Sequence, residues 1–380
     1  MRVLHVAPSV AREYGGPTIS LLGYAEAGQR AGAEITVAAP VAEGEGAGWF
    51  GERAAQVGVE LRPFRGRGRD AFVRSRELGR WLHTQAASFD LVHVHGLLNP
   101  VSTMAARECR LTGVPMVVRP FGMLSRYTFT HRRGWAKHLV FRLLDGPNLR
   151  AAKAVHFTTR SEMEQAAWHG ISFADKGFVV PPPLGEAVVG EASRPDESGP
   201  PVVLFLSRLH PVKSVETLIA GWSAVLEDHP TARLVIAGDG DPEYVAGLRR
   251  LAVGVMNIDF VGFAAGEAKR DLLASAHAFV LPSHHENFGV AVAEALAAGL
   301  PVVVTAEVQL ASLIQDHRLG VVAEREPERF ARAISDILSD PVLRRHCAEM
   351  GPQIMAEQFS LPSVSVRLMT MYRHVLRDAN

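Results

Sequence analysis

The stretch AFVLPSHHENFGVAVAEALAAG occupies residues 278–299 and joins a short apolar run to a longer alanine-rich segment. The run 278–282 has the length and composition of a buried strand, and the segment that ends near Gly299 has those of a helix. A strand, a loop and a helix in this order form the repeating unit of a parallel α/β sheet. The sequence therefore predicts an α/β fold, with residues 283–289 in the loop after a strand.

The same alternation of strand and helix extends in both directions along the chain. We expect strands at residues 3–7, 34–39, 91–95, 115–119 and 154–158, with helices at 18–30 and 71–85. A second series follows, with strands expected at residues 201–207, 233–238, 258–262, 278–282 and 301–304 and a short strand near 319–322. A helix is expected at residues 215–227. Two series predict two Rossmann-like, doubly wound parallel sheets, with the carboxyl ends of their strands facing a central cleft.

The boundary between these domains is predicted by a stretch rich in Gly, Pro, Ser, Asp and Glu. We expect domains at residues 1–184 and 201–362, with a linker at 185–200. The last helix, near 363–376, is expected to pack back with residues 363–380 on the first domain.

The composition excludes several classes of protein. Two cysteines far apart, Cys109 and Cys347, cannot form a disulfide framework or a CxxC zinc site. The first residues lack a signal-peptide pattern, and no apolar stretch is long enough to span a bilayer. We therefore expect a cytoplasmic protein, at most peripheral on the inner face of the plasma membrane.

The charge is zero overall but unevenly distributed. Residues 1–200 carry 24 Lys and Arg against 19 Asp and Glu, and residues 60–142 carry 15 against 5. This basic region is interpreted either as solvated arginine faces or as a patch for an anionic membrane or a phosphorylated acceptor. Residues 131–142 are expected to form a basic amphipathic helix. A near-neutral pI and the lack of a recognised motif argue against nucleic acid.

Two carboxylates flank the start of the helix in residues 283–299. Glu286 lies in the loop, and Glu294 follows eight residues later in an otherwise apolar helix. A lone carboxylate there must be solvated, paired or bound to a ligand. Free backbone amides are expected at Phe288, Gly289 and Val290, where a helix N-terminus favours hydroxyls or anionic oxygens.

These residues resemble a known family. Glu286 and Glu294, with the intervening Asn-Phe-Gly, are similar to the E-x7-E motif of the retaining GT-B glycosyltransferases of family 4, which use nucleotide-diphospho-sugars. Four further stretches resemble that family's motifs in the same order: PSVAREYGGPT (8–18), DLVHVHG (90–96), SRLHPVKS (207–214) and AGDGD (237–241). The resemblance covers nearly the whole chain. It implies acceptor binding by the first domain and donor binding by the second.

The resemblance also implies roles for individual side chains. Arg208 and Lys213 would neutralise the diphosphate leaving group, although Ser214 replaces the family's glycine. Glu286 would hold the hydroxyls of the donor sugar and Glu294 those of the ribose. The remaining implied donor-site residues are Gly15, Gly16, Gly238, Gly262, Phe263, Asn287, Phe288, Gly289 and Val290.

Two of the implied positions have serious alternatives. His95 would contact the transferred sugar or the acceptor, but a packed structural histidine is a rival interpretation. A metal pair with His93 is conceivable, and no third ligand is suggested by the spacing. Phe263 would border the nucleobase, whereas packing in the core is an equally good interpretation.

The implied reaction is a metal-free transfer of a hexose with retention, with Arg208, Lys213, Glu286 and His95 as the catalytic residues. The donor would be a UDP- or GDP-sugar and the acceptor a glycan or polyprenyl-linked glycan in exopolysaccharide or lipopolysaccharide assembly. The departing phosphate oxygen, with no protein nucleophile, would take the acceptor proton. The alternatives are a small soluble acceptor, a nucleotide-sugar epimerase of the same fold and a non-catalytic sugar-binding protein.

Overall fold

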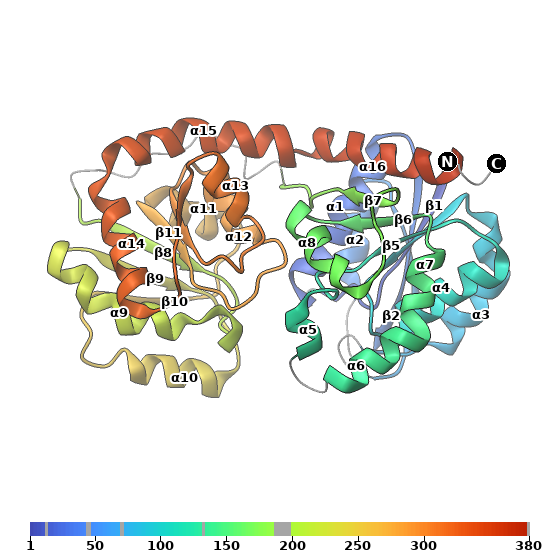
Figure 1. Cartoon of the computed structure of the whole chain (residues 1–380), viewed down its shortest axis with the longest axis horizontal. Helices are drawn as coiled ribbons and strands as arrows, with labels where there is room; N and C mark the ends of the chain where they lie inside the picture. The colour runs from blue at the N-terminus through green and yellow to red at the C-terminus, as the bar shows by residue number, and fades with distance from the viewer. Residues whose placement is uncertain (12–13, 43–46, 69–71, 131–133, 186–198, 378–380) are drawn as a thin grey trace. The chain divides into compact units, whose positions relative to one another are not determined.

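Two parallel β-sheets form the framework of the computed structural model, one in each of two compact units (Figure 1). The structure describes residues 1–11, 14–42, 47–68, 72–130, 134–185 and 199–377. Unit 1 comprises Met1–Pro183 and Phe359–Asn380, and unit 2 comprises Leu184–Gln358. The predicted α/β fold with two Rossmann-like sheets is confirmed.

The sheet of unit 1 has seven parallel strands in the order β3-β2-β1-β4-β5-β6-β7. The strands are β1 (Arg2–Val6), β2 (Glu34–Ala42), β3 (Glu60–Gly66), β4 (Leu91–His95), β5 (Met116–Arg119), β6 (Ala154–Phe157) and β7 (Gly177–Val179). The order reverses between β1 and β4, whose register pairs His5 with His93. At such a switch point the loops after two neighbouring strands diverge and leave room for a ligand.

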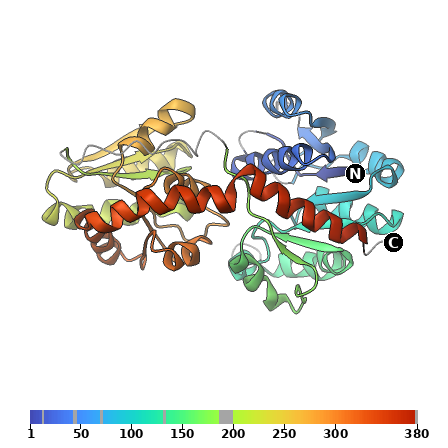
Figure 2. The same ribbon diagram turned by 90° about the horizontal axis from the view of Figure 1, so that it is seen from above.

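Helices cover both faces of this sheet (Figures 1 and 2). They are α1 (Gly16–Arg30), α2 (Gly48–Gln56), α3 (Arg76–Gln85), α4 (Pro100–Thr112), α5 (Arg126–Thr130), α6 (Gly134–Val140), α7 (Gly146–Ala151), α8 (Arg160–Ala166) and α16 (Leu361–Arg377). Alternate strand residues divide between two cores: Val3 and Leu91 pack with α1, α2 and α16, whereas Leu4 and Val92 pack with α3, α4 and α7. Period-2 alternation with both faces buried is typical of a parallel sheet.

Strand β3 was not among the predicted strands, because its residues were interpreted only as part of the basic region. It lies at the edge of the sheet, paired with β2 alone. Arg62 and Arg65 are exposed there, and Phe64 is buried. An edge strand tolerates both its proline, Pro63, and its charged side chains.

Helix α16 returns to unit 1 from the far end of the chain. Leu361, Val364, Leu368 and Tyr372 are buried in the same core as β1 and α1. Figure 2 shows α16 running beside α1, and the Ser365 hydroxyl donates to the Ala27 carbonyl over 2.9 Å. The C-terminal segment is therefore a structural part of unit 1.

The sheet of unit 2 has six parallel strands in the order β10-β9-β8-β11-β12-β13. The strands are β8 (Val202–Leu206), β9 (Arg233–Ala237), β10 (Ile258–Gly262), β11 (Ala278–Leu281), β12 (Val302–Val304) and β13 (Gly320–Val322). The α-helices are α9 (Val215–Asp228), α10 (Pro242–Leu251), α11 (Gly266–Ser275), α12 (Val290–Ala297), α13 (Ala311–Asp316), α14 (Pro327–Ser339) and α15 (Pro341–Phe359). The order again reverses between two neighbouring strands, here β8 and β11.

The predicted linker lies almost wholly outside the described residues, which omit 186–198. The observed division falls after Pro183, next to the predicted end of the first domain. In the part of the chain that the structure describes, no helix is long and apolar enough to cross a membrane.

A glycine in α9 sets how closely this helix packs on α14. A Cβ on Gly221 would lie 2.4 Å from the backbone oxygen of Pro327, which cannot move without shifting the helix. Gly247 in α10 has only the far end of the Arg250 side chain near its Cβ position, at 3.8 Å. The two helical glycines of unit 2 therefore form a matched pair for alanine substitution, one crowded and one open.

We predict that Gly221→Ala lowers the free energy of unfolding by about 2 kcal/mol or more, because the added methyl overpacks a backbone contact. Gly247→Ala should raise it by about 0.5–1 kcal/mol, since alanine is the better helix former. Urea denaturation of both variants measures the difference, and equal effects would contradict the packing argument.

Candidate functional site

The loops after β8 and β11 lie at the switch point of unit 2. The pairing of these strands sets Ala278 beside Val203 and Phe279 beside Leu204. The loop after β8 carries Arg208 and Lys213, and the loop after β11 carries Glu286. The backbone amide of His284 donates to the Val212 carbonyl over 2.8 Å, which ties the two loops together.

Lys213 and Glu286 form an ion pair across these loops. The Lys213 ammonium donates to Oε2 of Glu286, and their side chains are only 13% and 18% exposed. Lys213 ends a short 3₁₀ helix, η7 (Pro211–Lys213), whose first turn is capped by Nδ1 of His210. A hydrogen bond between charged groups is stronger than one between neutral groups, so this pair ties the two loops together.

Ser214 takes the left-handed conformation, with φ of 53°. Glycine adopts this conformation without steric cost, which gives a physical reason for a glycine at this position in the family's motif. Ser214 compensates in part through a 3.0 Å hydrogen bond between its hydroxyl and that of Thr217. The departure from the motif therefore leaves a turn that leads directly into α9.

Glu286 is held by a segment that the sequence did not suggest. Its amide donates to the Glu307 carbonyl, and its carbonyl accepts from the Gln309 amide, both over 3.2 Å. This isolated bridge to Val308 extends the sheet into the loop. The neighbouring His285 ring has a lowered pKa, because burial outweighs the attraction of Glu286.

The helix after this loop begins at Val290, two residues after the first of the predicted amides, Phe288. Gly289 is the N-cap of α12, in the left-handed conformation with φ of 85°, and Val290 is its first residue. Of the three predicted amides, only that of Val290 belongs to the first turn. Phe288 is buried, and Asn287 lies between it and Glu286. The positive end of α12 still lies within a few residues of Glu286.

Glu294 is paired with a lysine that the sequence did not single out. Lys269 in α11 donates to Oε1 of Glu294 over 2.6 Å, and both side chains are largely buried. The expectation that this carboxylate is solvated, paired or ligand-bound is therefore met by an ion pair. Nothing in the spacing of Lys269 links it to Glu294, because α11 and α12 meet only in the folded unit.

Gly238 and Gly262, two of the predicted glycines of the second domain, are favoured at their positions for different physical reasons. A Cβ on Gly238 would lie 1.9 Å from the Ser207 carbonyl oxygen, so only glycine allows the loop after β9 to approach the loop after β8. Gly262 has φ of 77° but open space around it. Phe263 follows it and is 63% exposed, so the interpretation as a core residue was wrong. Arg208 is also exposed.

In unit 1, Gly15 and Gly16 begin α1 at the end of the loop after β1. Gly15 is the N-cap, with φ of 73°, a conformation that favours glycine. A Cβ on Gly16 would meet no atom within 4 Å, so packing does not require glycine there. The roles of both residues toward a phosphate stay predictions.

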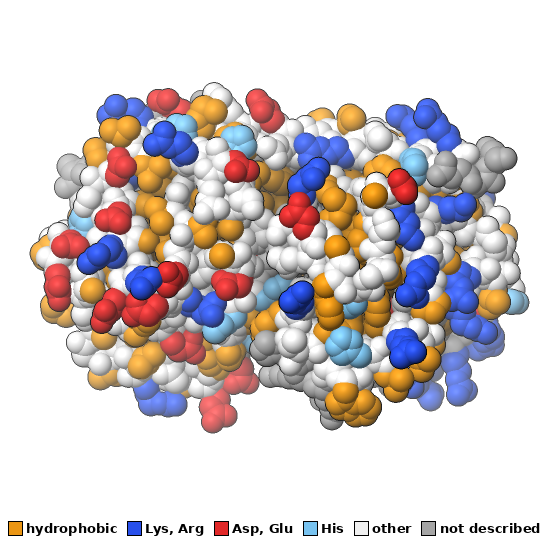
Figure 3. Space-filling model, in the orientation of Figure 1, with side chains coloured by type: hydrophobic (Ala, Val, Ile, Leu, Met, Phe, Trp, Pro, Cys, Tyr) orange, Lys and Arg blue, Asp and Glu red, His pale blue; other side chains and the backbone are white. Residues whose placement is uncertain are grey.

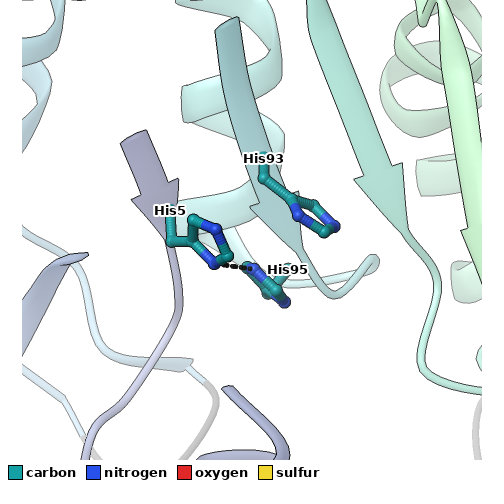
Figure 4. Close-up of side chains that lie close together, drawn as sticks. All are labelled: His5, His93 and His95. Atoms are coloured by element: carbon teal, nitrogen blue, oxygen red, sulfur yellow. Dashed lines mark hydrogen bonds between the residues drawn. The ribbon is translucent and has the colours of Figure 1, made fainter. Parts of the chain in front are cut away.

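His95 ends β4 in a buried cluster of histidines. His5, on the neighbouring β1, supplies the third nitrogen that the spacing in β4 did not suggest: ligand atoms of His5, His93 and His95 lie within 4.8 Å of one another (Figure 4). Burial lowers the pKa of His5 to about 3 and those of His93 and His95 well below the usual value. All three rings are therefore neutral at physiological pH.

The described part of the basic amphipathic segment is helical. Residues 131–133 lie outside the described residues, α6 covers Gly134–Val140, and a π-helical turn follows at Phe141–Asp145. Trp135 is 75% exposed, and Leu139 and Leu143 are exposed beside it in sequence. Figure 3 shows apolar side chains at the position where Figure 1 labels α6.

Two family models match the chain in succession. Residues 15–183 match a "Glycosyl transferase 4-like domain", and residues 191–354 match "Glycosyl transferases group 1". The first match lies within unit 1, and the second nearly coincides with unit 2.

Individual relatives agree with this assignment. The GDP-mannose-dependent alpha-(1-6)-phosphatidylinositol dimannoside mannosyltransferase of Mycobacterium tuberculosis is 36% identical over 172 residues, 45% of this chain and 44% of that protein. The D-inositol 3-phosphate glycosyltransferase of Frankia alni is 32% identical over 189 residues, 47% and 46% of the two chains. The matches thus span less than half the length of these curated relatives.

A solved structure shows the likeness over the whole chain. Anabaena HepE in complex with UDP superposes with a TM-score of 0.76 at 18% identity, covering 98% of this chain and 100% of the other. At that identity the likeness concerns the fold, which is the GT-B arrangement of two Rossmann-like domains. The two family matches, the relatives and the two sheets together show that this chain belongs to the group 1, family 4 glycosyltransferases of GT-B fold.

Proposed function

We propose that the chain transfers a sugar from a nucleotide-diphospho-sugar to a glycan or lipid-linked acceptor, with retention of anomeric configuration. The observation that carries this proposal is the set of charges at the switch point of unit 2. There the Lys213–Glu286 pair bridges the loops after β8 and β11, and exposed Arg208 lies in the first of these loops. Two cations and a carboxylate suit a sugar attached to a diphosphate, because the cations can bind the phosphates and the carboxylate can accept from sugar hydroxyls.

Lys213 and Arg208 act on the leaving group. When the bond from the anomeric carbon to the phosphate oxygen breaks, its electron pair stays on the diphosphate, whose negative charge grows. Lys213 shifts from Glu286 toward this charge, and Glu286 then accepts hydrogen bonds from the sugar hydroxyls. The acceptor oxygen bonds to the anomeric carbon on the same face, and its proton passes to the departing phosphate oxygen.

Glu294 and Lys269 serve the other end of the donor. Glu294 lies four residues into α12 from Val290, about 6 Å along the helix axis. Its carboxylate accepts from the vicinal hydroxyls of the ribose, and the ion pair with Lys269 holds it in position. Exposed Phe263 offers an aromatic surface at the end of β10 for the base.

The donor class is supported by the relatives but its base stays open. The mycobacterial relative is named as GDP-mannose-dependent, and the solved neighbour holds UDP. Incubation with UDP- and GDP-sugars, followed by NMR, separates the candidate functions. Slow release of nucleotide supports a transferase, interconversion of sugars indicates an epimerase, and binding without turnover indicates a sugar-binding protein. Acceptor trials with the best donor then distinguish a lipid-linked glycan from a small soluble molecule.

We predict that Lys213→Gln lowers kcat by about 10²- to 10³-fold, because it removes a charge that is needed most in the transition state. Glu286→Gln should lower kcat/KM by at least about 10-fold, since an amide is a weaker acceptor for the sugar hydroxyls. Arg233→Gln, in the exposed pair with Asp259, is the control and should leave both constants unchanged. Nucleotide release measures all three.

The outcome for Glu286→Gln is decisive for its role. Nearly unchanged turnover would contradict sugar binding by Glu286. A covalent glycosyl adduct trapped on the wild-type carboxylate would instead make Glu286 a nucleophile and overturn the same-face mechanism.

We predict that the reaction is independent of divalent metal. Both site carboxylates, Glu286 and Glu294, already have lysine partners, so the diphosphate charge can be met by Lys213 and Arg208 instead of a metal ion. The rate of nucleotide release should be the same with EDTA as without it. A loss of rate that magnesium or manganese restores would contradict this prediction.

We also propose that α6 and the turn after it contact an anionic membrane surface. Trp135, Leu139 and Leu143 are exposed, and Lys137 and Arg142 belong to the same segment. Apolar side chains with basic neighbours match the boundary between lipid tails and anionic head groups. Contact with a membrane through this segment would give the enzyme access to a lipid-linked acceptor.

Co-sedimentation with vesicles of phosphatidylglycerol and phosphatidylethanolamine at low salt should carry the protein into the pellet. We expect Trp135→Ser to weaken partitioning about 10-fold, because a large apolar side chain no longer enters the interface. Met256→Ser, which changes another exposed apolar residue in unit 2, should have no effect. Failure of the wild-type protein to sediment at low salt removes the membrane proposal.

A further inference from the structure

A chain of buried hydrogen bonds runs across the face of the unit 1 sheet that α16 covers. His156 contacts the Val180 carbonyl through Nε2 over 2.6 Å and Nε2 of His93 through Nδ1 over 3.2 Å. The Tyr372 hydroxyl lies 2.9 Å from Nδ1 of His93 and 3.0 Å from Nε2 of His5. Nδ1 of His5 lies 3.0 Å from Nε2 of His95 (Figure 4).

The Val180 carbonyl, at the start of this chain of hydrogen bonds, determines which nitrogen of each ring carries the proton. A carbonyl only accepts, so His156 must donate from Nε2 and leave Nδ1 as an acceptor. His93 then donates from Nε2 and accepts at Nδ1 from the Tyr372 hydroxyl. This direction follows because a neutral imidazole carries one proton, and burial keeps the pKa of each of these rings far below its usual value.

The same logic continues to the end of the chain. The Tyr372 oxygen has given its only proton to His93, so it accepts from Nε2 of His5. His5 therefore accepts at Nδ1, and His95 donates from Nε2. Nδ1 of His95 is left as a bare acceptor, with no hydrogen-bond partner among the described residues although it is buried.

An unsatisfied donor belongs to the residue paired with His95. Arg119 is the register partner of His95 on β5, and its Nε is also buried and without a partner in the described structure. The guanidinium is fixed by a 3.1 Å hydrogen bond from Nη1 to the Ser20 hydroxyl. It also lies over the ring of Phe121, 3.9 Å from its centroid. A hydroxyl group, which donates once and accepts elsewhere, complements such an acceptor and donor.

We propose that the chain Val180–His156–His93–Tyr372–His5 positions His95 in the Nε2-protonated tautomer, so that Nδ1 accepts a hydrogen bond from a hydroxyl of the bound sugar or acceptor. The contact to a sugar rests on the proposed function, whereas the tautomer rests on the hydrogen bonds alone. The C-terminal helix α16 takes part in this hydrogen-bonded chain through Tyr372, because the Tyr372 hydroxyl links His93 to His5.

The reversed tautomer would defeat this arrangement. If Nδ1 of His95 carried the proton, it would present an N–H instead of a lone pair, and a hydroxyl would lose its acceptor. A buried polar group left without its partner costs about 1–3 kcal/mol, so a ligand that meets this acceptor binds more tightly than one that cannot. His5, His93, His156 and Tyr372 are thus positioning residues that act through His95.

A metal ion is the competing explanation for the cluster of His5, His93 and His95. A metal would need lone pairs of these three rings at about 2 Å. In the hydrogen-bonded chain those of His5 and His93 already accept protons from His95 and Tyr372. Binding of zinc would therefore break the chain, and the two explanations exclude one another.

Tyr372→Phe and Tyr24→Phe are a matched pair for the test. Each removes one buried hydroxyl, and the Tyr24 hydroxyl donates to the same Val180 carbonyl over 2.9 Å but lies outside the chain. Nitrogen-15 NMR of histidine-labelled protein reads the tautomer of His95, assigned with His95→Asn. We expect Nδ1 to be unprotonated in the wild type and in Tyr24→Phe, and at least partly protonated in Tyr372→Phe, where the His5–His95 pair can reverse.

The enzymatic activity of the same variants provides a second test of the positioning chain. We expect kcat/KM to fall about 10-fold in Tyr372→Phe and to stay near the wild-type value in Tyr24→Phe. Should Tyr372→Phe fail to fold, His156→Gln and His156→Leu replace it. The amide of glutamine can donate to Val180 and accept from His93 and so should keep the tautomer, whereas leucine should release it.

Three results would overturn the proposal. These are an Nδ1-protonated His95 in the wild type, an unchanged tautomer in both Tyr372→Phe and His156→Leu, or stoichiometric zinc that survives dialysis of the purified protein. If the tautomer behaves as expected but no nucleotide-sugar is turned over, the positioning chain stands and the proposed transferase function fails. The NMR and kinetic readings therefore separate the two.

Discussion

The pairing of β8 with β11 is the constraint on which the candidate donor site depends. Two strands about 75 residues apart in the chain become neighbours in a parallel sheet, so the loops at their carboxyl ends emerge side by side. The hydrogen bond from His284 to Val212 fixes the distance between the loops, and Lys213 then reaches Glu286. Neither loop could hold this ion pair alone, because each contributes only one sign of charge to it.

The Lys213–Glu286 and Lys269–Glu294 ion pairs of unit 2 also explain how partly buried carboxylates are stabilised. Burial disfavours the ionised form of an isolated Glu, and a lysine partner within hydrogen-bond distance offsets that cost. Glu286 and Glu294 each have such a partner, Lys213 and Lys269. Both carboxylates are therefore paired with a lysine in the structure described.

Unit 1 also buries polar side chains, and most of these are neutral imidazole rings. Its sheet places His5, His93, His95 and His156 on one face of neighbouring strands, together with the guanidinium of Arg119. The rings of His5, His93 and His156 can be buried at low cost because each is neutral and hydrogen-bonded at both nitrogens, whereas His95 is bonded at Nε2 alone. The C-terminal helix completes the network through Tyr372, which joins β1 to β4 through its hydroxyl.

The sequence by itself determined the two α/β sheets, most strand positions and the motif residues, because strand and helix periodicities and short loops are local properties of the chain. It did not show β3, whose arginines and proline are compatible with a strand only at the edge of a sheet. It also missed Lys269, His5, His156 and Tyr372, whose partners lie 24 to 367 residues away along the chain. Only the tertiary structure decided these contacts, because strand order and helix docking bring together side chains whose separation in sequence carries no periodic signal.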